Sequence, residues 1–197
     1  MKPIPIIFIT LILDQGLKIW VKTNMYLGQE YQLLDWFYIH FTENNGMAFG
    51  IELGGYYGKL ALSLFRLVFV GVIASFLAKL VRKKADKILI VSISLVLAGA
   101  IGNIIDGTFY GLLFSESYHQ LATFMPEDGG YAPLFFGRVV DMFYFPLFKG
   151  YLPEWLPFWG GDYFVFFRPV FNIADAAISI GVGIMILFQK RMMKELE

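Results

Sequence analysis

Four apolar stretches constrain this chain more than any other feature, because each is long enough to cross the hydrocarbon core of a bilayer. They cover residues 4–20, 60–80, 88–105 and 170–188, and a spanning helix needs roughly 20 apolar residues. Only 16% of the residues are charged, whereas a soluble domain is about a quarter charged. We therefore predict one integral membrane domain over residues 1–197, all-α in class, with four transmembrane helices.

The first stretch begins like a secretory signal peptide, since Lys2 precedes the apolar run. Asp14 and Lys18 interrupt that run, however, and no small-residue cleavage site follows it. We expect a retained helix.

Basic residues predict the orientation of the helices, because Lys and Arg favour the cytoplasmic side of a membrane. They are concentrated in the short loop 79–87 and in the tail after residue 188. In contrast, residues 23–58 contain no Lys or Arg, and residues 107–168 contain only three. Both termini and the basic loop are expected in the cytoplasm, with the two long loops outside.

The outer loops are expected to carry structure of their own. Residues 31–41 alternate and are rich in Tyr, Trp and Phe, which predicts a short strand in a small β-element at the interface. Residues 112–168 contain many aromatic residues, and these prefer the headgroup level. This second loop is expected to rest on the membrane surface.

Composition excludes several kinds of site. The net charge is zero, so no global basic field attracts nucleic acid. The chain has no cysteine, which excludes disulfides, thiolate metal ligands and cysteine nucleophiles. With only two histidines, a His-rich metal site is not expected, and no cofactor is predicted.

Polar residues cluster where a membrane protein normally has few. An ionisable residue at the centre of a span costs about 2.5 to 3.5 kcal/mol on the translocon scale, which makes it a candidate functional residue. The predicted topology brings the outer helix ends and both outer loops to one membrane face. The candidates are Asp14, Lys18, Asn44, Asn45, Asn103, Asp106, Asp141, Asn172 and Asp175.

Among these residues, a pair of carboxylates is the simplest group that could catalyse a reaction. Two carboxylates held close together cannot both ionise easily, so one keeps its proton while the other acts as a base. Such a pair activates a water molecule and protonates a leaving amine, as in aspartic peptidases. The residues alone do not name a substrate.

Structural roles stay open for the same residues. Asp14 and Lys18 are four apart and can form an ion pair on one helix face. Asn103 and Asp106 could hydrogen-bond between helices. The helix dipole could stabilise Asp175 without any chemistry.

Five short motifs, in their order along the chain, carry a family resemblance. They are DQGLK at 14–18, NNGMAFG at 44–50, GAIGNIID at 99–106, VVDMF at 139–143 and FNIADA at 171–176. Together they resemble the motif set of lipoprotein signal peptidase, also called signal peptidase II. The resemblance spans nearly the whole chain, including the four apolar stretches and their orientation.

The resemblance implies a role for each candidate residue. Asp141 and Asp175 would be the catalytic dyad, sharing a proton and activating the hydrolytic water. Asp14 and Lys18 would brace the first helix beneath the site. The residues that would shape and support the site are Asn44, Gly102, Asn103, Asp106, Asn172 and Ala174.

The resemblance also implies a substrate, a location and an inhibitor. The substrate would be a prolipoprotein whose cysteine carries diacylglycerol, and cleavage would fall just before that cysteine. The family fold has four transmembrane helices, a small periplasmic β-cradle and a short periplasmic helix, in the bacterial inner membrane. Inhibition by the cyclic peptide globomycin, contact with membrane lipid and a monomeric state are expected, with no metal or organic cofactor.

Two departures from the family pattern stand out. Gly107 follows Asp106 where many family members have an arginine that holds the substrate backbone, and Arg138 is our candidate to replace it. The stretches from 106 to 141 and from 141 to 172 are also longer than usual. The extra loop could act as a lid over the site or cover lipid-facing surface.

Two rival functions remain at this point. An intramembrane aspartic peptidase of the GlyXaaGlyAsp type is disfavoured, because that motif is absent. A small transporter or lipid-binding protein could use the same polar cluster as a binding site. Transporters often have repeated halves or broken helices, and the sequence contains no internal repeat.

Overall fold

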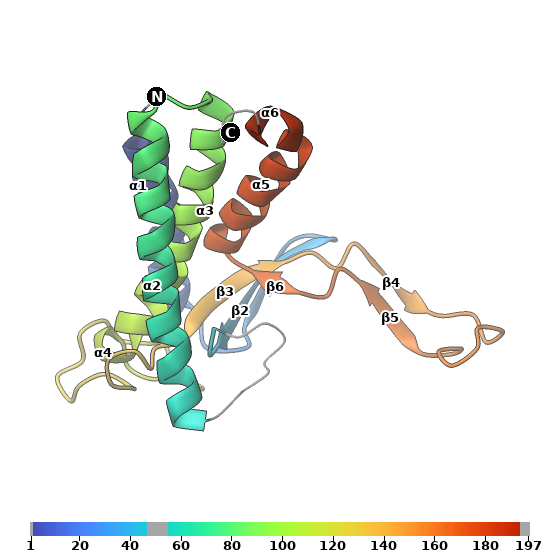
Figure 1. The fold of residues 1–197 in the computed structure, drawn as a ribbon. Coiled ribbons are helices and arrows are strands. Elements are labelled where there is room, and N and C mark those ends of the chain that lie inside the picture. Colours follow the sequence, from blue (N-terminus) through green and yellow to red (C-terminus); the bar gives the residue numbers. More distant parts are fainter. Residues whose placement is uncertain (1, 47–54, 194–197) are drawn as a thin grey trace.

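The computed structural model describes residues 2–46 and 55–193. A bundle of helices packs at one end against a small sheet (Figure 1). The chain starts with helix α1 (Ile4–Asn24), and β1 and β2 follow it. Helix α2 (Gly55–Arg82) and helix α3 (Lys87–Ile105) come next. Helix α3 continues through the π-helical turn η2 (Asp106–Tyr110) into α4 (Gly111–Leu113).

Three helices are long and apolar enough to cross a membrane: α1, α2, and α3 together with its extension to Leu113. The fourth predicted stretch, 170–188, is shorter as a helix, because α5 covers only Ile173–Leu187 and α6 (Gln189–Met193) follows. At about 1.5 Å per residue, the 15 residues of α5 reach roughly 22 Å, less than the ~30 Å core. A four-span topology therefore stays a prediction.

The sheet is antiparallel and larger than the sequence suggested. Its strands β1 (Glu30–Leu34), β2 (Phe37–Asn44), β3 (Val139–Tyr144) and β6 (Val170–Phe171) lie in that order. It lies at the end of the bundle opposite the two termini (Figure 1). Two further strands, β4 (Phe148–Tyr151) and β5 (Tyr163–Phe166), form a separate hairpin that projects sideways from the body (Figure 1).

Two sequence predictions were wrong in detail. The single strand expected over 31–41 is a hairpin of β1 and β2, because the chain turns at residues 35–36. Residues 170–171 belong to the sheet and pair with β3, so they are not helical. The expected combination of an all-α bundle with a small β-cradle is present in coarse form as three long apolar helices with a small antiparallel sheet. Of the second outer loop, residues 107–113 are helical and residues 114–169 form strands and turns.

Two apolar clusters hold the bundle and sheet together, with the polar residues of α3 between them. One cluster joins the ends of α2 and α3 around Leu80 and Ile90. The other joins α1, η2 and the sheet around Val21, Phe41 and Val140.

Small residues bring α3 and α5 into backbone contact. A Cβ on Gly99 would lie 2.2 Å from the carbonyl oxygen of Ala174, and one on Gly102 would lie 2.7 Å from Oδ2 of Asp14. Small residues permit this kind of close approach between membrane helices. This packing brings the first turn of α5 against α3, which positions the site described below.

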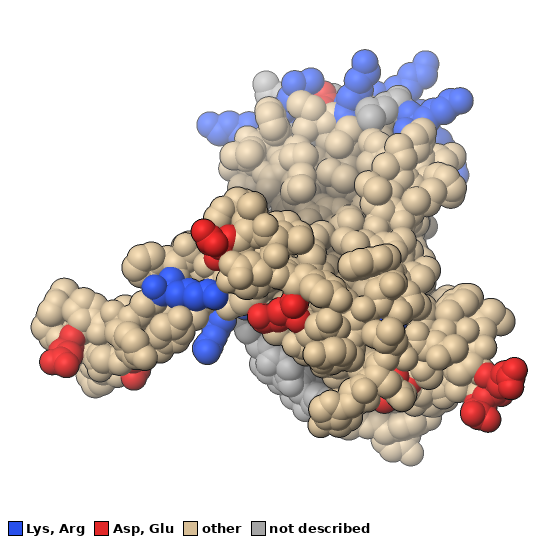
Figure 2. Space-filling view, turned by 180° about the vertical axis from the view of Figure 1, so that it is seen from behind, with Lys and Arg blue, Asp and Glu red and all other residues tan. Residues whose placement is uncertain are grey.

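The charges are divided between the two ends of the molecule. Lys and Arg side chains gather at the end that holds both termini, whereas the opposite end carries most of the visible Asp and Glu (Figure 2). This is the asymmetry from which the sequence predicted the orientation.

Candidate active site

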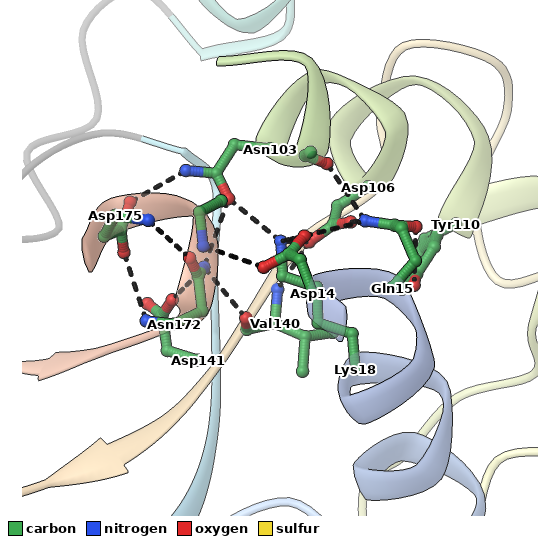
Figure 3. Close-up of polar contacts among 12 residues, drawn as sticks. Asp14, Gln15, Lys18, Asn103, Asp106, Tyr110, Val140, Asp141, Asn172 and Asp175 are labelled. Carbon is green, nitrogen blue, oxygen red and sulfur yellow. Dashed lines mark hydrogen bonds and ion pairs between the residues drawn. The ribbon is translucent and has the colours of Figure 1, made fainter. Parts of the chain in front are cut away.

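Two aspartates are brought together by the junction between the sheet and α5. Asp141 lies on the central strand β3 and is buried, with 6% of its surface exposed. Asp175 lies in the first turn of α5, which begins where β6 ends. Because β6 pairs with β3, the sheet holds the start of α5 beside Asp141 (Figure 3).

A capping box fixes Asp175. Oδ1 of Asn172 accepts a hydrogen bond of 2.9 Å from the Asp175 amide, and Oδ2 of Asp175 accepts one of 3.3 Å from the Asn172 amide. This reciprocal pair satisfies two backbone donors at the helix start. The carboxylate of Asp175 therefore lies at the positive end of the α5 dipole, which favours its charged form.

Three asparagine side chains hold the two aspartates by donating hydrogen bonds to them. Asn172 donates to Oδ1 of Asp141 over 2.7 Å, and Asn44 donates to Oδ2 of Asp141 over 2.5 Å. Asn103 donates to Oδ1 of Asp175 over 2.8 Å. Asn172 also donates to Oδ1 of Asn103, over 3.1 Å, which links the groups around both carboxylates (Figure 3). In the described part of the chain, the hydrogen-bond donors to both carboxylates are neutral amide groups.

The environment of Asp141 favours its protonated form. Burial raises the pKa of this carboxyl from its ordinary 3.8 to about 7, and the nearby charge of Asp175 adds to the rise. The charge of Lys18 and the hydrogen bond from Asn172 act in the opposite direction. Burial and the neighbouring negative charge therefore both favour the protonated form of Asp141 near neutral pH.

A buried lysine supports the site from α1. Nζ of Lys18 lies 2.9 Å from Asp14, 2.8 Å from Asp106 and 3.0 Å from the amide oxygen of Asn103. The predicted pair between Asp14 and Lys18 is present, and Asp106 extends it to α3. Oδ1 of Asp14 accepts a hydrogen bond of 2.9 Å from the Ala174 amide, so the cluster also fixes the start of α5.

Asp106 connects this cluster to β3. Its Oδ2 accepts a hydrogen bond of 3.2 Å from the amide of Val140, the residue before Asp141. Its Oδ1 accepts one of 2.9 Å from Gln15, whose side-chain oxygen accepts one of 3.1 Å from Tyr110. Asp106 begins the π-helical turn η2, and such turns are frequent at functional sites.

Arg138 belongs to a second ionic network, which is partly exposed. Its guanidinium contacts Glu116 at 2.7 Å and Glu43 at 3.1 Å, and Glu43 also pairs with Lys22. In the described part of the chain, the guanidinium of Arg138 forms its hydrogen bonds and ion pairs with these two glutamates and not with Asp141 or Asp175. Its expected role as a substrate-binding arginine stays a prediction, and its two carboxylate partners favour a bracing role for β2 and β3.

A polar face of α2 adds residues that the sequence analysis missed. Lys59, Ser63 and Arg66 share one face, and they contact the backbone of loops beside the dyad. Arg66 donates to the carbonyl of Gly46, whose amide donates to Oδ1 of Asn44 over 2.6 Å. Since Asn44 donates to Asp141, hydrogen bonds connect α2 to the dyad.

The structure thus brings most of the predicted site residues into one cluster. The cluster contains Asp14, Lys18, Asn44, Gly102, Asn103, Asp106, Asp141, Asn172, Ala174 and Asp175, whereas Arg138 lies in the neighbouring network. Met47 to Gly50 of the second motif lie outside the described residues. Within the described ranges, no group of three or more His, Cys, Asp or Glu residues is arranged to hold a metal ion.

Comparisons with known proteins agree on one family. The family model described as signal peptidase (SPase) II matches residues 6–190. A lipoprotein signal peptidase of Porphyromonas gingivalis is 56% identical over 94% of this chain and 81% of its own length. One of Amoebophilus asiaticus is 38% identical over 92% of this chain and 75% of its own. A solved bacterial membrane enzyme, 26% identical, superimposes with a TM-score of 0.63 over 96% of this chain and 87% of its own.

Proposed function

This chain belongs to the signal peptidase II family and is a membrane-embedded lipoprotein signal peptidase, and on that basis we propose that Asp141 and Asp175 are its catalytic dyad. The enzyme removes the signal peptide from prolipoproteins. The finer proposal is that the substrate carries a diacylglyceryl-modified cysteine and that cleavage falls just before it. The observation that carries the dyad assignment is the pair of carboxylates held by asparagine amides on β3 and α5.

In the proposed reaction the two aspartates have different tasks. Asp175, ionised at the N-terminus of α5, takes a proton from a water molecule, whose oxygen attacks the carbonyl carbon before the modified cysteine. Asp141, protonated, donates a hydrogen bond to the carbonyl oxygen as negative charge develops there. When the tetrahedral intermediate collapses, the C–N bond breaks and a proton passes to the amine of the cysteine.

The supporting residues are proposed to hold this asymmetry. Asn44, Asn103 and Asn172 orient the carboxylates without adding positive charge. Asp106 fixes the backbone of β3 through the Val140 amide, and Lys18 bridges α1 to α3. Asp14 and Gly102 allow Ala174 to pack tightly, which sets the position of Asp175.

The location of the site supports a cut at the membrane surface. Hydrolysis needs water, while the diacylglyceryl chains of the substrate stay in lipid, and the junction of helices and sheet serves both. We propose the bacterial inner membrane, four spans, cytoplasmic termini and a periplasmic site, on the strength of the charge asymmetry. A monomer that contacts lipid, binds globomycin and needs no cofactor completes the proposal.

The test is cleavage by purified variants. Wild type, Asp141→Asn, Asp175→Asn and the exposed-loop control Asp128→Asn are each given a diacylglyceryl-modified prolipoprotein, and signal-peptide loss is followed by gel shift. We expect both dyad variants to stay folded, by thermal stability, and to cleave nothing, with Asp128→Asn at the wild-type rate. Near wild-type cleavage by either dyad variant would refute the assignment and turn attention to Asp106 or Asp14.

A further inference from the structure

The hairpin of β4 and β5 with its connecting loop, residues 147–167, forms an arm that lacks a core. No residue from 147 to 169 is buried. The loop is closed on itself by backbone hydrogen bonds, such as that of 2.9 Å from the Leu152 amide to the Asp162 carbonyl. Figure 1 shows the arm running away from the bundle, across the direction of the helices and not along it.

The arm exposes too much aromatic surface for a segment in water. Phe158 is 94% exposed and Trp155 79% exposed at its tip. A two-stranded hairpin by itself is at best marginally stable in water, and an apolar patch of more than a few hundred Å² normally marks an interaction site. Each aromatic side chain can bury about 150 to 250 Å², so the arm needs something to cover it.

The register of the hairpin sorts its side chains onto two unlike faces. Phe148 lies opposite Phe166, and Gly150 lies opposite Phe164. Residues directly opposite in an antiparallel pair share a face, so this face consists of three Phe side chains and a glycine. We call it the Phe face, and it contains no polar side-chain atom.

The opposite face of the hairpin is polar at its edges. Tyr151 lies opposite Tyr163 with ring centroids 5.2 Å apart, and Lys149 lies opposite Val165. Nζ of Lys149 lies 4.9 Å from the ring of Tyr38 on β2. We call this the Tyr face, since it presents hydroxyl groups and an ammonium group.

The level of the arm indicates what covers the Phe face. The chain leaves the arm at Phe167 and reaches the start of α5 at Ile173, so the arm joins the body where an apolar helix ends. The outer surfaces of the helices are apolar at exposed residues such as Phe8 and Val68. The arm therefore lies at the level where the apolar surface of the bundle ends (Figure 1), which in a bilayer is the headgroup level, where Trp and Tyr are preferred.

We propose that the arm is an interfacial membrane anchor, with its Phe face in the acyl boundary of the adjacent leaflet and its Tyr face toward headgroups and water. An amphipathic element of this kind binds through its buried apolar area. The arm is continuous with β3 and β6, which carry Asp141 and lead to Asp175. Anchoring it thus sets the depth of the dyad, and hence of the scissile bond, relative to the lipid. The anchor itself does not depend on peptidase activity, whereas this consequence rests on the proposed dyad.

Depth measurement tests the anchor directly, because the chain has no cysteine and a single introduced cysteine is labelled alone. Phe166→Cys and Tyr163→Cys in the full chain are spin-labelled in nanodiscs of phosphatidylethanolamine and phosphatidylglycerol. Accessibility to oxygen and to a water-soluble nickel chelate is then compared. Ile9→Cys, on exposed α1 surface, calibrates lipid, and Asp128→Cys calibrates water.

We expect the oxygen-to-nickel ratio at 166 to approach that at 9, and the ratio at 163 to lie nearer that at 128. Nickel accessibility at both arm sites equal to that at 128 would overturn the proposal, because the arm would then lie in water. Spin–spin coupling at 166 that grows with the number of chains per disc would also overturn it, since a second copy would then cover the Phe face.

The consequence for the dyad has its own readout. The triple variant Phe148→Ser, Phe164→Ser and Phe166→Ser is compared with wild type on the same lipidated substrate, in liposomes and in detergent. We expect a larger loss of cleavage in liposomes than in detergent, because only a bilayer imposes a depth. An equal loss in both would refute the depth-setting role. Cleavage by Asp141→Asn or Asp175→Asn would instead refute the dyad assignment and would leave the anchor result from the depth measurement intact.

Discussion

The raised pKa of Asp141 makes the stability of the protein depend on pH in a direction opposite to that of most carboxylates. A carboxyl whose pKa rises on folding contributes stability that is fully present below its unfolded pKa, here 3.8, and is lost as pH rises to its folded pKa of about 7. One pKa unit corresponds to about 1.36 kcal/mol. Between pH 5 and pH 8 the wild type should therefore lose roughly 3 kcal/mol from this one group.

The substitution Asp141→Asn removes that dependence. Its amide cannot accept both hydrogen bonds that Asn44 and Asn172 donate to the carboxyl group, which costs about 1 kcal/mol at every pH. The variant should thus be slightly less stable than wild type at pH 5 and more stable at pH 8. For a chain of this size, a relative change of ~3 kcal/mol corresponds to a Tm change of about 6 to 12 °C.

Thermal unfolding in detergent, followed by intrinsic fluorescence at pH 5 and pH 8, measures the difference. Asp128→Asn is the matched control, because it removes an exposed loop carboxylate, and its Tm should follow wild type at both pH values. If the Tm difference between wild type and Asp141→Asn is the same at pH 5 and pH 8, Asp141 does not hold the proton. If Asp175→Asn shows the pH-dependent difference in its place, the tasks of the two aspartates are reversed.

Three further predictions concern the supporting residues. Gly102→Ala should lower cleavage at least about tenfold, equivalent to ~1.4 kcal/mol, because the added Cβ would meet Asp14 and Ala174. Gly107→Ala is the control, since a Cβ at that position meets nothing within 4 Å, and this variant should cleave normally. Lys18→Met should destabilise the protein by about 3 to 5 kcal/mol, since it leaves Asp14 and Asp106 buried without their cation. Thermal unfolding measures this loss of stability, and the double variant with Asp106→Asn should recover part of it. Arg66→Met should lower kcat more than it raises KM, because it removes a charged hydrogen bond to the Gly46 carbonyl, worth about 1.5 to 3 kcal/mol, and Gly46 in turn bonds to Asn44. Leu64→Ala, on the exposed side of α2, should leave kcat and KM unchanged. An equal effect of both variants would argue that α2 acts only as a scaffold.

The helices were predictable because a long apolar run leaves few alternatives in lipid. The start of α1 and the end of α3 match the predicted ranges, whereas the end of α1 and the start of α5 do not, because polar tertiary contacts decide them. Helix α1 runs on to Asn24, and within that last turn Lys22 is buried against Glu43, a strand residue far along the chain. Helix α5 starts at Ile173 because Asn172 caps it and the residues before it pair with β3.

The sheet shows a second limit of the sequence. The alternation over 31–41 correctly indicated β-structure, but the turn at residues 35–36 is Asp-Trp and lacks the Asn-Gly or Asp-Gly signal of a tight hairpin. The aromatic content of the second outer loop was visible, whereas its division into a Phe face and a Tyr face depends on a register that only the pairing of β4 with β5 defines.

Arg66 was missed although the rule that selected Asp14 applies equally to it. It is a single arginine within the apolar run 60–80, and a charge there is a candidate functional residue. Gln15 was passed over for a different reason, because a neutral amide carries no comparable cost. Its contacts with Gly102 and Asp106 arise from helix packing, which no local pattern encodes.

The choice of asparagines around the dyad follows from the chemistry that two carboxylates must perform. A cation bound directly to each aspartate would favour ionisation of both, and the shared proton would be lost. Asn44, Asn103 and Asn172 orient the carboxylates by hydrogen bonds that carry no charge. Lys18 bonds to Asn103 and pairs with two other aspartates, Asp14 and Asp106, so the net charge of that cluster is negative when all three are ionised.

The negative cluster opposes a second negative charge at the dyad, and the charge of Asp106 adds to the raised pKa of Asp141. Asp175 lies at the N-terminus of α5, where it takes part in the capping box. The two aspartates therefore differ because one lies on a buried strand and the other at a helix N-terminus. Moving the negative charge should change the balance: Asp106→Asn is expected to lower the pKa of Asp141 and to shift the alkaline limb of cleavage to lower pH. An unchanged alkaline limb in a folded Asp106→Asn variant would mean that burial alone sets the proton on Asp141.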